Sequence, residues 1–148
     1  MSTLDDAWQG GLAAEERAVF GYGVLGPHLS GADRPLAFTC VDEHEALRDA
    51  TAADLAGAGR TPVPALSDYP DLYPVIDAVA ARRLAVRLEE GCADAWRYLY
   101  LQAASRTSAQ AAALRRSAQQ ALTASAVRAT RWRALVDPRH AATPFPGL

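Results

Sequence analysis

Four polar residues lie on the apolar stripes of four separate segments with helical periodicity: Glu15, His44, Glu89 and Arg128. In a bundle of helices such side chains would meet at a common axis, where carboxylates and imidazoles bind divalent metal ions. A guanidinium instead stays protonated, repels a cation and binds a carboxylate through two hydrogen bonds. The set therefore predicts either a metal site or an internal cluster of ion pairs.

A di-iron centre in a four-helix bundle requires a specific set of ligands, against which these residues can be compared. It takes one Glu from each of two helices and a Glu-x-x-His pair from each of the other two. Glu15 and Glu89 fit the positions of the single carboxylates. The second and fourth segments depart from the pattern, because they carry Val41-x-x-His44 and Ser125-x-x-Arg128. Three of the six ligands that a di-iron centre needs are therefore present.

We therefore expect a structural polar cluster of all four residues, with no bound metal, no cofactor and no catalytic residue. Removing one partner from such a cluster would strand a buried charge, at a cost of about 3–5 kcal/mol. The alternative is a single divalent ion held by Glu15, His44 and Glu89. Phosphate-binding loops, nucleophile elbows and Cys-x-x-Cys pairs do not occur in the sequence. Cys40 and Cys92 are expected to be small buried apolar groups.

The segments that would position these residues are four predicted helices, at about residues 4–29, 35–56, 75–104 and 108–136. In each of them apolar residues recur at steps of three and four, which returns a side chain to one face of a helix. In the first segment the stripe is Trp8, Leu12, Glu15, Val19, Tyr22 and Gly26. The glycines at 21, 23 and 26 suggest close packing against a neighbouring helix. In the third segment Glu89 is favoured over Glu90 as the inward carboxylate, although helical phase alone does not separate them.

The long connection between the second and third helices is predicted to be a strap at 57–74. Pro62 and Pro64 prevent a helix there, and several apolar residues suggest that the strap lies against the bundle. A C-terminal tail is predicted at 137–148, with Phe145 and Leu148 as apolar anchors. Residues 1–148 are thus expected to form one all-α domain, an up-down four-helix bundle with a long crossover between helices 2 and 3.

Aromatic residues near the strap leave a second possibility open. Four tyrosines could line a surface groove beside it, for a partner peptide or a small molecule: Tyr69, Tyr73, Tyr98 and Tyr100. Glu43 and Glu45 flank His44 on other faces of the second helix, and we expect them to be solvated charges.

Charge is divided unevenly along the chain. Residues 1–94 hold sixteen acidic residues and seven arginines, whereas residues 95–148 hold one acidic residue and eight arginines, so the two parts carry about −9 and +7. The simplest explanation is that arginines of the last helix pair with carboxylates of the earlier helices. Nucleic-acid binding through an exposed face with Arg115, Arg131 and Arg133 is a less favoured alternative.

The chain has no apolar run of the roughly 18 residues that span a bilayer. Its N-terminus is acidic, with Asp5 and Asp6, where a secretory signal needs a basic start followed by an apolar stretch. We therefore expect a cytoplasmic protein that does not bind membranes.

Several runs in the chain resemble the actinobacterial ferritin-like domain family of unknown function. They are Leu12-Ala13-Ala14-Glu15, Tyr22-Gly23-Val24, His44 with Arg48-Asp49, Val86-Arg87-Leu88-Glu89-Glu90-Gly91-Cys92-Ala93, Ala126-Val127-Arg128-Ala129, Arg131-Trp132-Arg133 and Phe145-Pro146-Gly147. The resemblance covers nearly the whole chain and implies a ferritin-like four-helix bundle to which no activity is assigned. One departure is Glu16, where a histidine often follows the first glutamate of the family.

These observations together predict a non-catalytic ferritin-like protein that acts through an interaction surface. Its expected partners are a second copy in a homodimer, another protein or a small molecule. The alternative is a metal-dependent ferritin-like oxidase or an iron-handling protein. The absence of Asp, Glu and His between Ser108 and Val136 argues against that alternative.

Overall fold

Four long helices dominate the computed structural model, which describes residues 3–142 and 144–145. They are α1 (Thr3–Leu25), α2 (Asp33–Gly57), α3 (Ala78–Ala104) and α4 (Ala109–Val136). Three short 3-10 helices accompany them, η1 (Gly26–His28), η2 (Pro70–Leu72) and η3 (Pro138–His140). No strand occurs among the described residues, so the predicted all-α class is confirmed. None of the helices in these ranges is long and apolar enough to cross a membrane.

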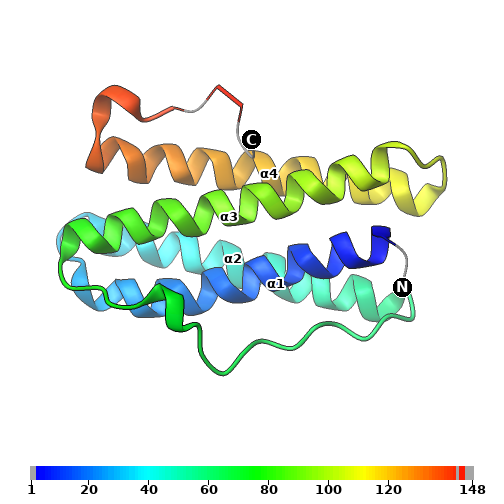
Figure 1. Ribbon diagram of the computed structural model, residues 1–148, viewed down its shortest axis with the longest axis horizontal. Helices are drawn as coiled ribbons and strands as arrows, with labels where there is room; N and C mark the ends of the chain where they lie inside the picture. Colours follow the sequence, from blue (N-terminus) through cyan, green and yellow to red (C-terminus); the bar gives the residue numbers. More distant parts are fainter. Residues whose placement is uncertain (1–2, 143, 146–148) are drawn as a thin grey trace.

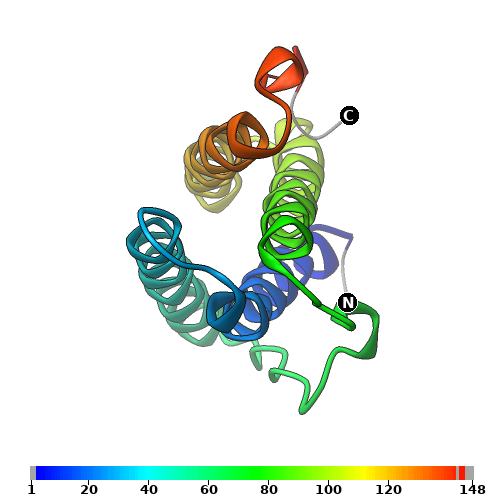
Figure 2. The same ribbon diagram turned by 90° about the vertical axis from the view of Figure 1, so that its left-hand side faces the viewer.

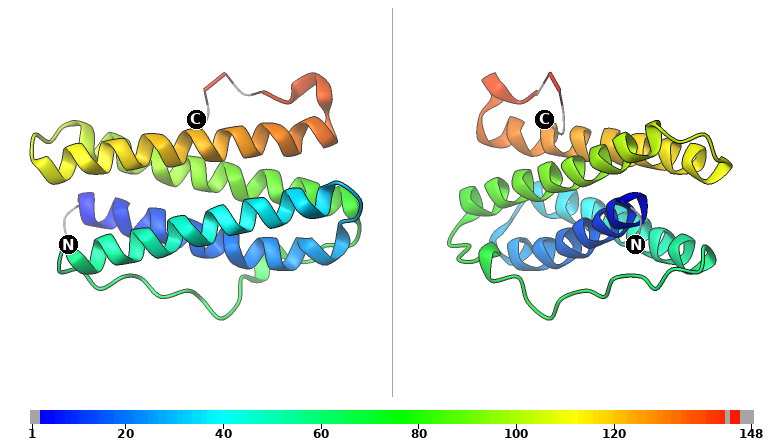
Figure 3. Two further views of the ribbon diagram at one scale, coloured as in Figure 1. Left: turned by 180° about the vertical axis from the view of Figure 1, so that it is seen from behind. Right: turned by 45° about the vertical axis from the view of Figure 1, so that its right-hand side comes forward.

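The helices form two antiparallel hairpins, α1 with α2 and α3 with α4 (Figure 1). The strap between α2 and α3 runs the length of the bundle, so α3 starts at the end where α2 also starts (Figure 3). Seen end on, the four helices surround a common axis, with α1 beside both α2 and α3 and with α3 beside α4 (Figure 2). The predicted bundle with a long crossover between its second and third helices is thus confirmed.

The helices begin and end at local signals in the sequence. At the start of α3 the Asp77 carboxylate accepts a hydrogen bond from the amide of Ala80 at 2.7 Å. Ser108 does the same for α4, and both residues satisfy an amide that the helix itself leaves unpaired. At the end of α2, Gly59 has a φ of 74°, and the amide of Arg60 donates to the carbonyl of Leu55 at 2.9 Å. This Schellman arrangement ends the helix, because the left-handed conformation suits glycine.

Two of the predicted ranges are too long. The first helix ends at Leu25 rather than near residue 29, because the chain tightens into a 3-10 turn at Gly26 and Pro27. The third helix begins at Ala78 rather than at residue 75, because Asp77 caps it. The strap therefore spans residues 58–77.

The strap is attached to α1 along its length. The Gln9 side chain donates to the carbonyl of Thr61 and accepts from the amide of Val63, both at 2.8 Å. Farther along, the Arg17 guanidinium donates two hydrogen bonds to the Asp71 carboxylate. These contacts place the apolar residues of the strap against the bundle.

The buried core is split into two apolar clusters. One contains Trp8, Trp96 and Leu114, and the other contains Leu25, Leu84 and Trp132. On α2, α3 and α4 the sequence positions of His44, Glu89 and Arg128 lie between those of the two clusters, and on α1 Glu15 lies near the end of the first cluster, before Ala18. A polar layer therefore divides the core of the bundle.

The C-terminal segment follows α4 back along the bundle (Figure 1). Arg133 donates to the carbonyl of Ala141 at 3.1 Å. Phe145 is 69% exposed, so the expectation that it anchors the tail is wrong. Leu148, the other expected anchor, lies outside the described residues.

The close packing expected at Gly21, Gly23 and Gly26 occurs at one of them. A Cβ at Gly21 would lie 2.5 Å from Cδ1 of Leu88, whereas Gly23 and Gly26 have no such neighbour within 4 Å. Gly21 thus allows α1 to approach α3, as does Gly11, where a Cβ would lie 3.0 Å from the Trp96 ring.

We predict that Gly21→Ala lowers the free energy of unfolding by about 1–2 kcal/mol, measured by urea denaturation. The added methyl group must displace the buried Leu88 side chain, and this cost exceeds the gain of up to about 1 kcal/mol from the better helix former. Gly91→Ala is the matched control. It lies in α3, and a Cβ there meets no atom within 4 Å, so it should keep or raise stability. Equal effects of the two substitutions would contradict the close approach.

Candidate functional site

The structure brings Glu15, His44, Glu89 and Arg128 together inside the bundle. Each comes from a different helix, in the order α1 to α4. The first three side chains are fully buried, and Arg128 is 4% exposed. We call these residues the polar cluster.

His44 is the centre of the polar cluster. Its Nδ1 lies 2.5 Å from Oε2 of Glu15, and its Nε2 lies 3.0 Å from Oε1 of Glu89. Since a carboxylate on each side can only accept, both ring nitrogens donate when the ring is protonated. Burial lowers the pKa of His44, but the hydrogen bonds and charges of the two carboxylates outweigh it and raise the pKa to about 9. His44 is therefore an imidazolium at neutral pH.

Glu89 accepts hydrogen bonds from all three of the other helices. The Tyr22 hydroxyl of α1 donates to Oε1 at 2.6 Å, and His44 of α2 donates to the same oxygen. From α4, Nε of Arg128 lies 3.1 Å from Oε1 and 3.0 Å from Oε2. Burial lowers the pKa of Arg128, yet the charge of Glu89 raises it above its usual value, so the guanidinium keeps its proton.

Further donors surround the polar cluster and complete its hydrogen bonding. Trp96 Nε1 donates to Oε1 of Glu15 at 2.7 Å, and Trp132 Nε1 donates to the hydroxyl of Tyr22 at 2.8 Å. The remaining nitrogens of Arg128 donate to Ser125 and Glu43. Every buried side-chain nitrogen and oxygen in the described part of the chain has a hydrogen-bond partner.

The charges within the polar cluster balance. Glu15 and Glu89 contribute two negative charges, and His44 and Arg128 contribute two positive ones. Taking charges out of water is expensive unless each is paired and hydrogen-bonded, and this arrangement meets both conditions.

Sequence reasoning missed several members of this network. Tyr22, Trp96 and Trp132 were not among the candidate site residues, although a buried tyrosine or tryptophan usually finds a partner for its polar tip. Glu43 was expected to be a solvated charge, and it is exposed, but the expectation missed its ion pair. Its carboxylate is half-exposed and pairs with Arg128 at 2.7 Å.

The other charged residues near the cluster have separate roles. Glu90 is half-exposed and pairs with Arg133 at 2.8 Å, so Glu89 is the inward carboxylate of the two. Arg115 donates to the carbonyls of Ala103 and Arg106 at the end of α3. Three arginines of α4 are thus engaged within the bundle, Arg128 and Arg133 with carboxylates and Arg115 with backbone carbonyls.

The two cysteines are buried and not joined by a disulfide. Cys92 Sγ lies 3.5 Å from the carbonyl oxygen of Ala14. Ligand atoms of Glu15, His44 and Cys92 lie within 4.8 Å of one another, close enough for one metal ion. Burial raises the pKa of the Cys92 thiol well above its usual value, so a thiolate ligand is costly to form there.

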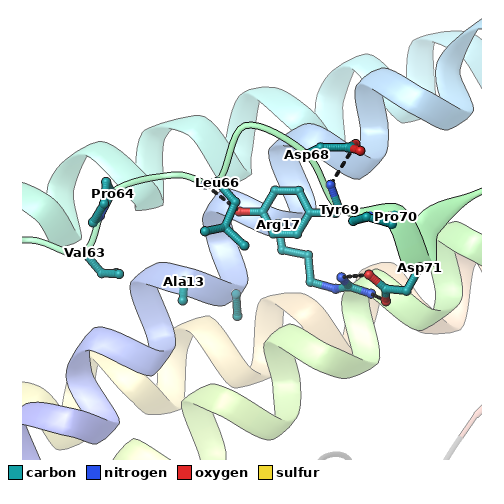
Figure 4. Close-up of a pocket in the computed structure, with 10 residues that line it drawn as sticks. Ala13, Arg17, Val63, Pro64, Leu66, Asp68, Tyr69, Pro70 and Asp71 are labelled. Atoms are coloured by element: carbon teal, nitrogen blue, oxygen red, sulfur yellow. Dashed lines mark hydrogen bonds and ion pairs between the residues drawn. The ribbon is translucent and has the colours of Figure 1, made fainter.

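A second feature is a groove of about 450 Å³ between α1 and the strap, which we call the strap groove (Figure 4). Tyr69 forms part of its wall, and Arg17 lies at 5.8 Å from the centre of the Tyr69 ring. The expectation that four tyrosines share one groove is wrong. Tyr73 lines a different hollow, and neither Tyr98 nor Tyr100 belongs to the described lining of the strap groove.

We predict that the stability of the protein falls between about pH 6.5 and pH 9 because of His44. Its pKa is raised in the folded state, so the folded protein holds a proton that the unfolded chain has released. The stabilisation is complete below pH 6.5 and is lost as the pH passes about 9. Its upper limit is roughly 3 kcal/mol. Urea denaturation at a series of pH values measures it.

His44→Gln is the control for this titration, because the variant keeps the cysteines and every other titrating group. Its stability should change less over the same range. An NMR titration of the wild-type His44 ring with a midpoint near 6.5 would contradict the prediction.

We also predict that Arg128→Met lowers the free energy of unfolding by about 3–5 kcal/mol, because it leaves Glu89 buried with one cation fewer. Glu89→Gln in the same chain should recover part of the loss, since it removes the uncompensated charge. Urea denaturation of the two single variants and the double variant gives the coupling energy between the positions. Additive losses would show that the two side chains do not interact.

The chain was compared with known proteins. Residues 7–148 match the family model described as "Domain of unknown function (DUF4439)". No protein with a curated description matches. The fold is similar to the crystal structure of a conserved hypothetical protein, rv2844, from Mycobacterium tuberculosis. The TM-score is 0.81 and the identity 32%, over 90% of this chain and 97% of that one.

A second similar structure is that of ferritin like, diiron-carboxylate proteins from Bacillus anthracis str. Ames. The TM-score is 0.77 over 93% of this chain and all of that one. The identity is 16%, so this likeness concerns the fold alone. The chain belongs to the DUF4439 family of unknown function and has a ferritin-like fold.

Proposed function

We propose that this protein is a non-catalytic ferritin-like bundle in which the polar cluster replaces a di-iron centre, and that it acts through contacts of its surface with another molecule. One observation carries the proposal. Nε of Arg128 lies within 3.1 Å of both carboxylate oxygens of Glu89. In a metal site these oxygens would need free lone pairs directed at the ions.

The side chains at the six ligand positions do not fit a di-iron centre. Val41 and Ser125 stand where carboxylates would bridge or bind the metals, and Arg128 stands where an imidazole would bind. The two remaining carboxylates already accept from His44, Tyr22 and other donors inside the bundle.

Electrostatics favour the same conclusion. A metal ligand must be deprotonated, yet the pKa of about 9 keeps His44 protonated at neutral pH. A divalent ion would also add two positive charges to a cluster whose charges already balance. Repulsion by Arg128 would oppose it at short range, in an interior where charges are poorly screened.

The surface of the bundle offers a site for a partner molecule in the strap groove. The strap groove has room for an apolar side chain or a small ligand, and its walls are mostly apolar, with Leu66 60% exposed. Arg128 and Arg133 of α4 are engaged with carboxylates, which leaves fewer cations for phosphates. A protein or small-molecule partner is therefore favoured over nucleic acid.

A metal-binding ferritin-like protein is the second candidate function. The close approach of ligand atoms from Glu15, His44 and Cys92 favours it. Binding there would require the release of a proton from His44 and from the thiol, so it would strengthen as the pH rises. The two candidates thus differ in metal content and in its pH dependence.

The experiment is elemental analysis of protein purified without a metal-affinity tag, repeated after incubation with ferrous iron in air. We expect much less than one metal ion per chain in both samples, and no difference between the wild type and Glu15→Ala. Near-stoichiometric metal that is lost in Glu15→Ala would contradict the proposal and support the second candidate.

A variant that restores the missing ligands is the positive control. Val41→Glu, Ser125→Glu and Arg128→His together rebuild the two Glu-x-x-His pairs on α2 and α4. This triple variant should take up iron under the conditions in which the wild type does not. Such a result would show that the fold still permits the centre and that the side chains prevent it.

A further inference from the structure

The first helical hairpin carries an open groove of about 450 Å³ between α1 and α2, which we call the hairpin groove. It shares no lining residue with the strap groove, and Tyr22, whose hydroxyl donates to Glu89, is part of its lining. Phe38 projects beside it and is 59% exposed, although it is one of the largest apolar side chains of the protein. Contiguous apolar surface is typical of contact sites, and here Phe38 lines the groove together with Val19, Ala37 and Val41.

The α2 side of the hairpin groove has a sequence pattern that is complementary to itself. It contains Arg34, Phe38, Val41 and Glu45 at steps of four, three and four, which place all four on one face of the helix. Read in the opposite direction, the order cation, aromatic, aliphatic, anion becomes anion, aliphatic, aromatic, cation. Two copies of α2 laid antiparallel would therefore place Arg34 of each against Glu45 of the other, and Phe38 against Val41.

The two charged ends of this pattern, Arg34 and Glu45, form no ion pair with another residue that the structure describes. Other charged residues of α2 do: Asp33 pairs with Arg82, Glu43 with Arg128, and Arg48 with Asp49. Within the ranges that the structure describes, Arg34 and Glu45 take part in no such pair. The hydrogen bond to Asp49 raises the pKa of Arg48, and the charge of Glu45 adds to this effect. Neither Glu45 nor Arg34 is held by a described residue in a direct ion pair that would compete with the antiparallel partner.

The α1 side of the hairpin groove leaves room for that partner. A Cβ built at Gly23 of α1 or at Gly26 of η1 would meet no described atom within 4 Å. Both line the groove beside the apolar pair of α2. Their small size allows a second helix to approach closely and to cover Phe38.

We propose that the hairpin groove binds a second copy of this chain, with the two α2 helices antiparallel about a two-fold axis between Phe38 and Val41. This deepens the surface role proposed above, because it names one surface and its partner. The contact is isologous, since both copies use the same residues. The assembly is therefore limited to two copies. The residues that line the strap groove are not part of this contact.

Charge reversal tests the pairing directly. In the proposed dimer, Arg34→Glu places two pairs of like charges across the interface, and Glu45→Arg does the same. Each single variant should weaken dimerisation by about tenfold or more, as expected for like charges in contact. The double variant Arg34→Glu and Glu45→Arg restores opposite charges and should return the dissociation constant to near its wild-type value.

Sedimentation equilibrium of the full chain measures these dissociation constants. Phe38→Asp should abolish the dimer, because it puts a charge at the centre of the interface. Asp54→Arg is the matched control, an exposed charge reversal on α2 outside the hairpin groove, and should leave the dimer intact. Circular dichroism of each variant checks that the helices are retained.

Three outcomes would overturn the inference. They are a wild-type protein that is monomeric up to about 100 µM, a dimer that tolerates Phe38→Asp, and single reversals that the double variant does not rescue. None of these outcomes depends on metal content, which tests the proposed non-catalytic role separately. A monomer without metal would reject the dimer and keep that role, whereas a rescued dimer with stoichiometric metal would do the reverse.

Discussion

The carboxylate of Glu89 is the group on which the interior of this bundle depends. It lies on α3 and accepts hydrogen bonds from Tyr22 of α1, His44 of α2 and Arg128 of α4. A carboxylate removed from water is stable only when each of its lone pairs is used and its charge is balanced. All four helices must therefore occupy one relative position before this residue can be buried.

This requirement gives the polar layer a role that apolar packing does not provide. The two apolar clusters on either side of it consist largely of Leu, Ala and Trp, and such cores tolerate rearrangement when total volume is kept. A helix that slid by one turn could repack those residues, but it would separate Glu15 from His44. We infer that the polar cluster contributes more to the uniqueness of the helix register than to net stability, as buried polar groups do in some coiled coils.

The repeat of apolar residues predicted the four helices and the inward direction of four polar side chains, because direction is a local property of a helix. The partners of those side chains are not local. Glu43 is adjacent to His44 in sequence and points elsewhere, yet its carboxylate reaches Arg128. The position of the strap depends on Gln9 and residues more than fifty positions away. The end of α1 at Leu25 and the start of α3 at Ala78 depend on single turns. The apolar repeat extends over a whole helix and does not resolve such turns.

The uneven distribution of charge along the chain has a consequence for folding during synthesis. A nascent polypeptide leaves the ribosome from its N-terminus, so α1, α2 and most of α3 emerge while the chain is strongly acidic. Glu89 is then exposed to solvent, because the guanidinium of Arg128 has not yet been made. Burying the acidic side chains at that stage would leave net negative charge in the interior. The interior can therefore close only after Arg128 of α4 has been translated.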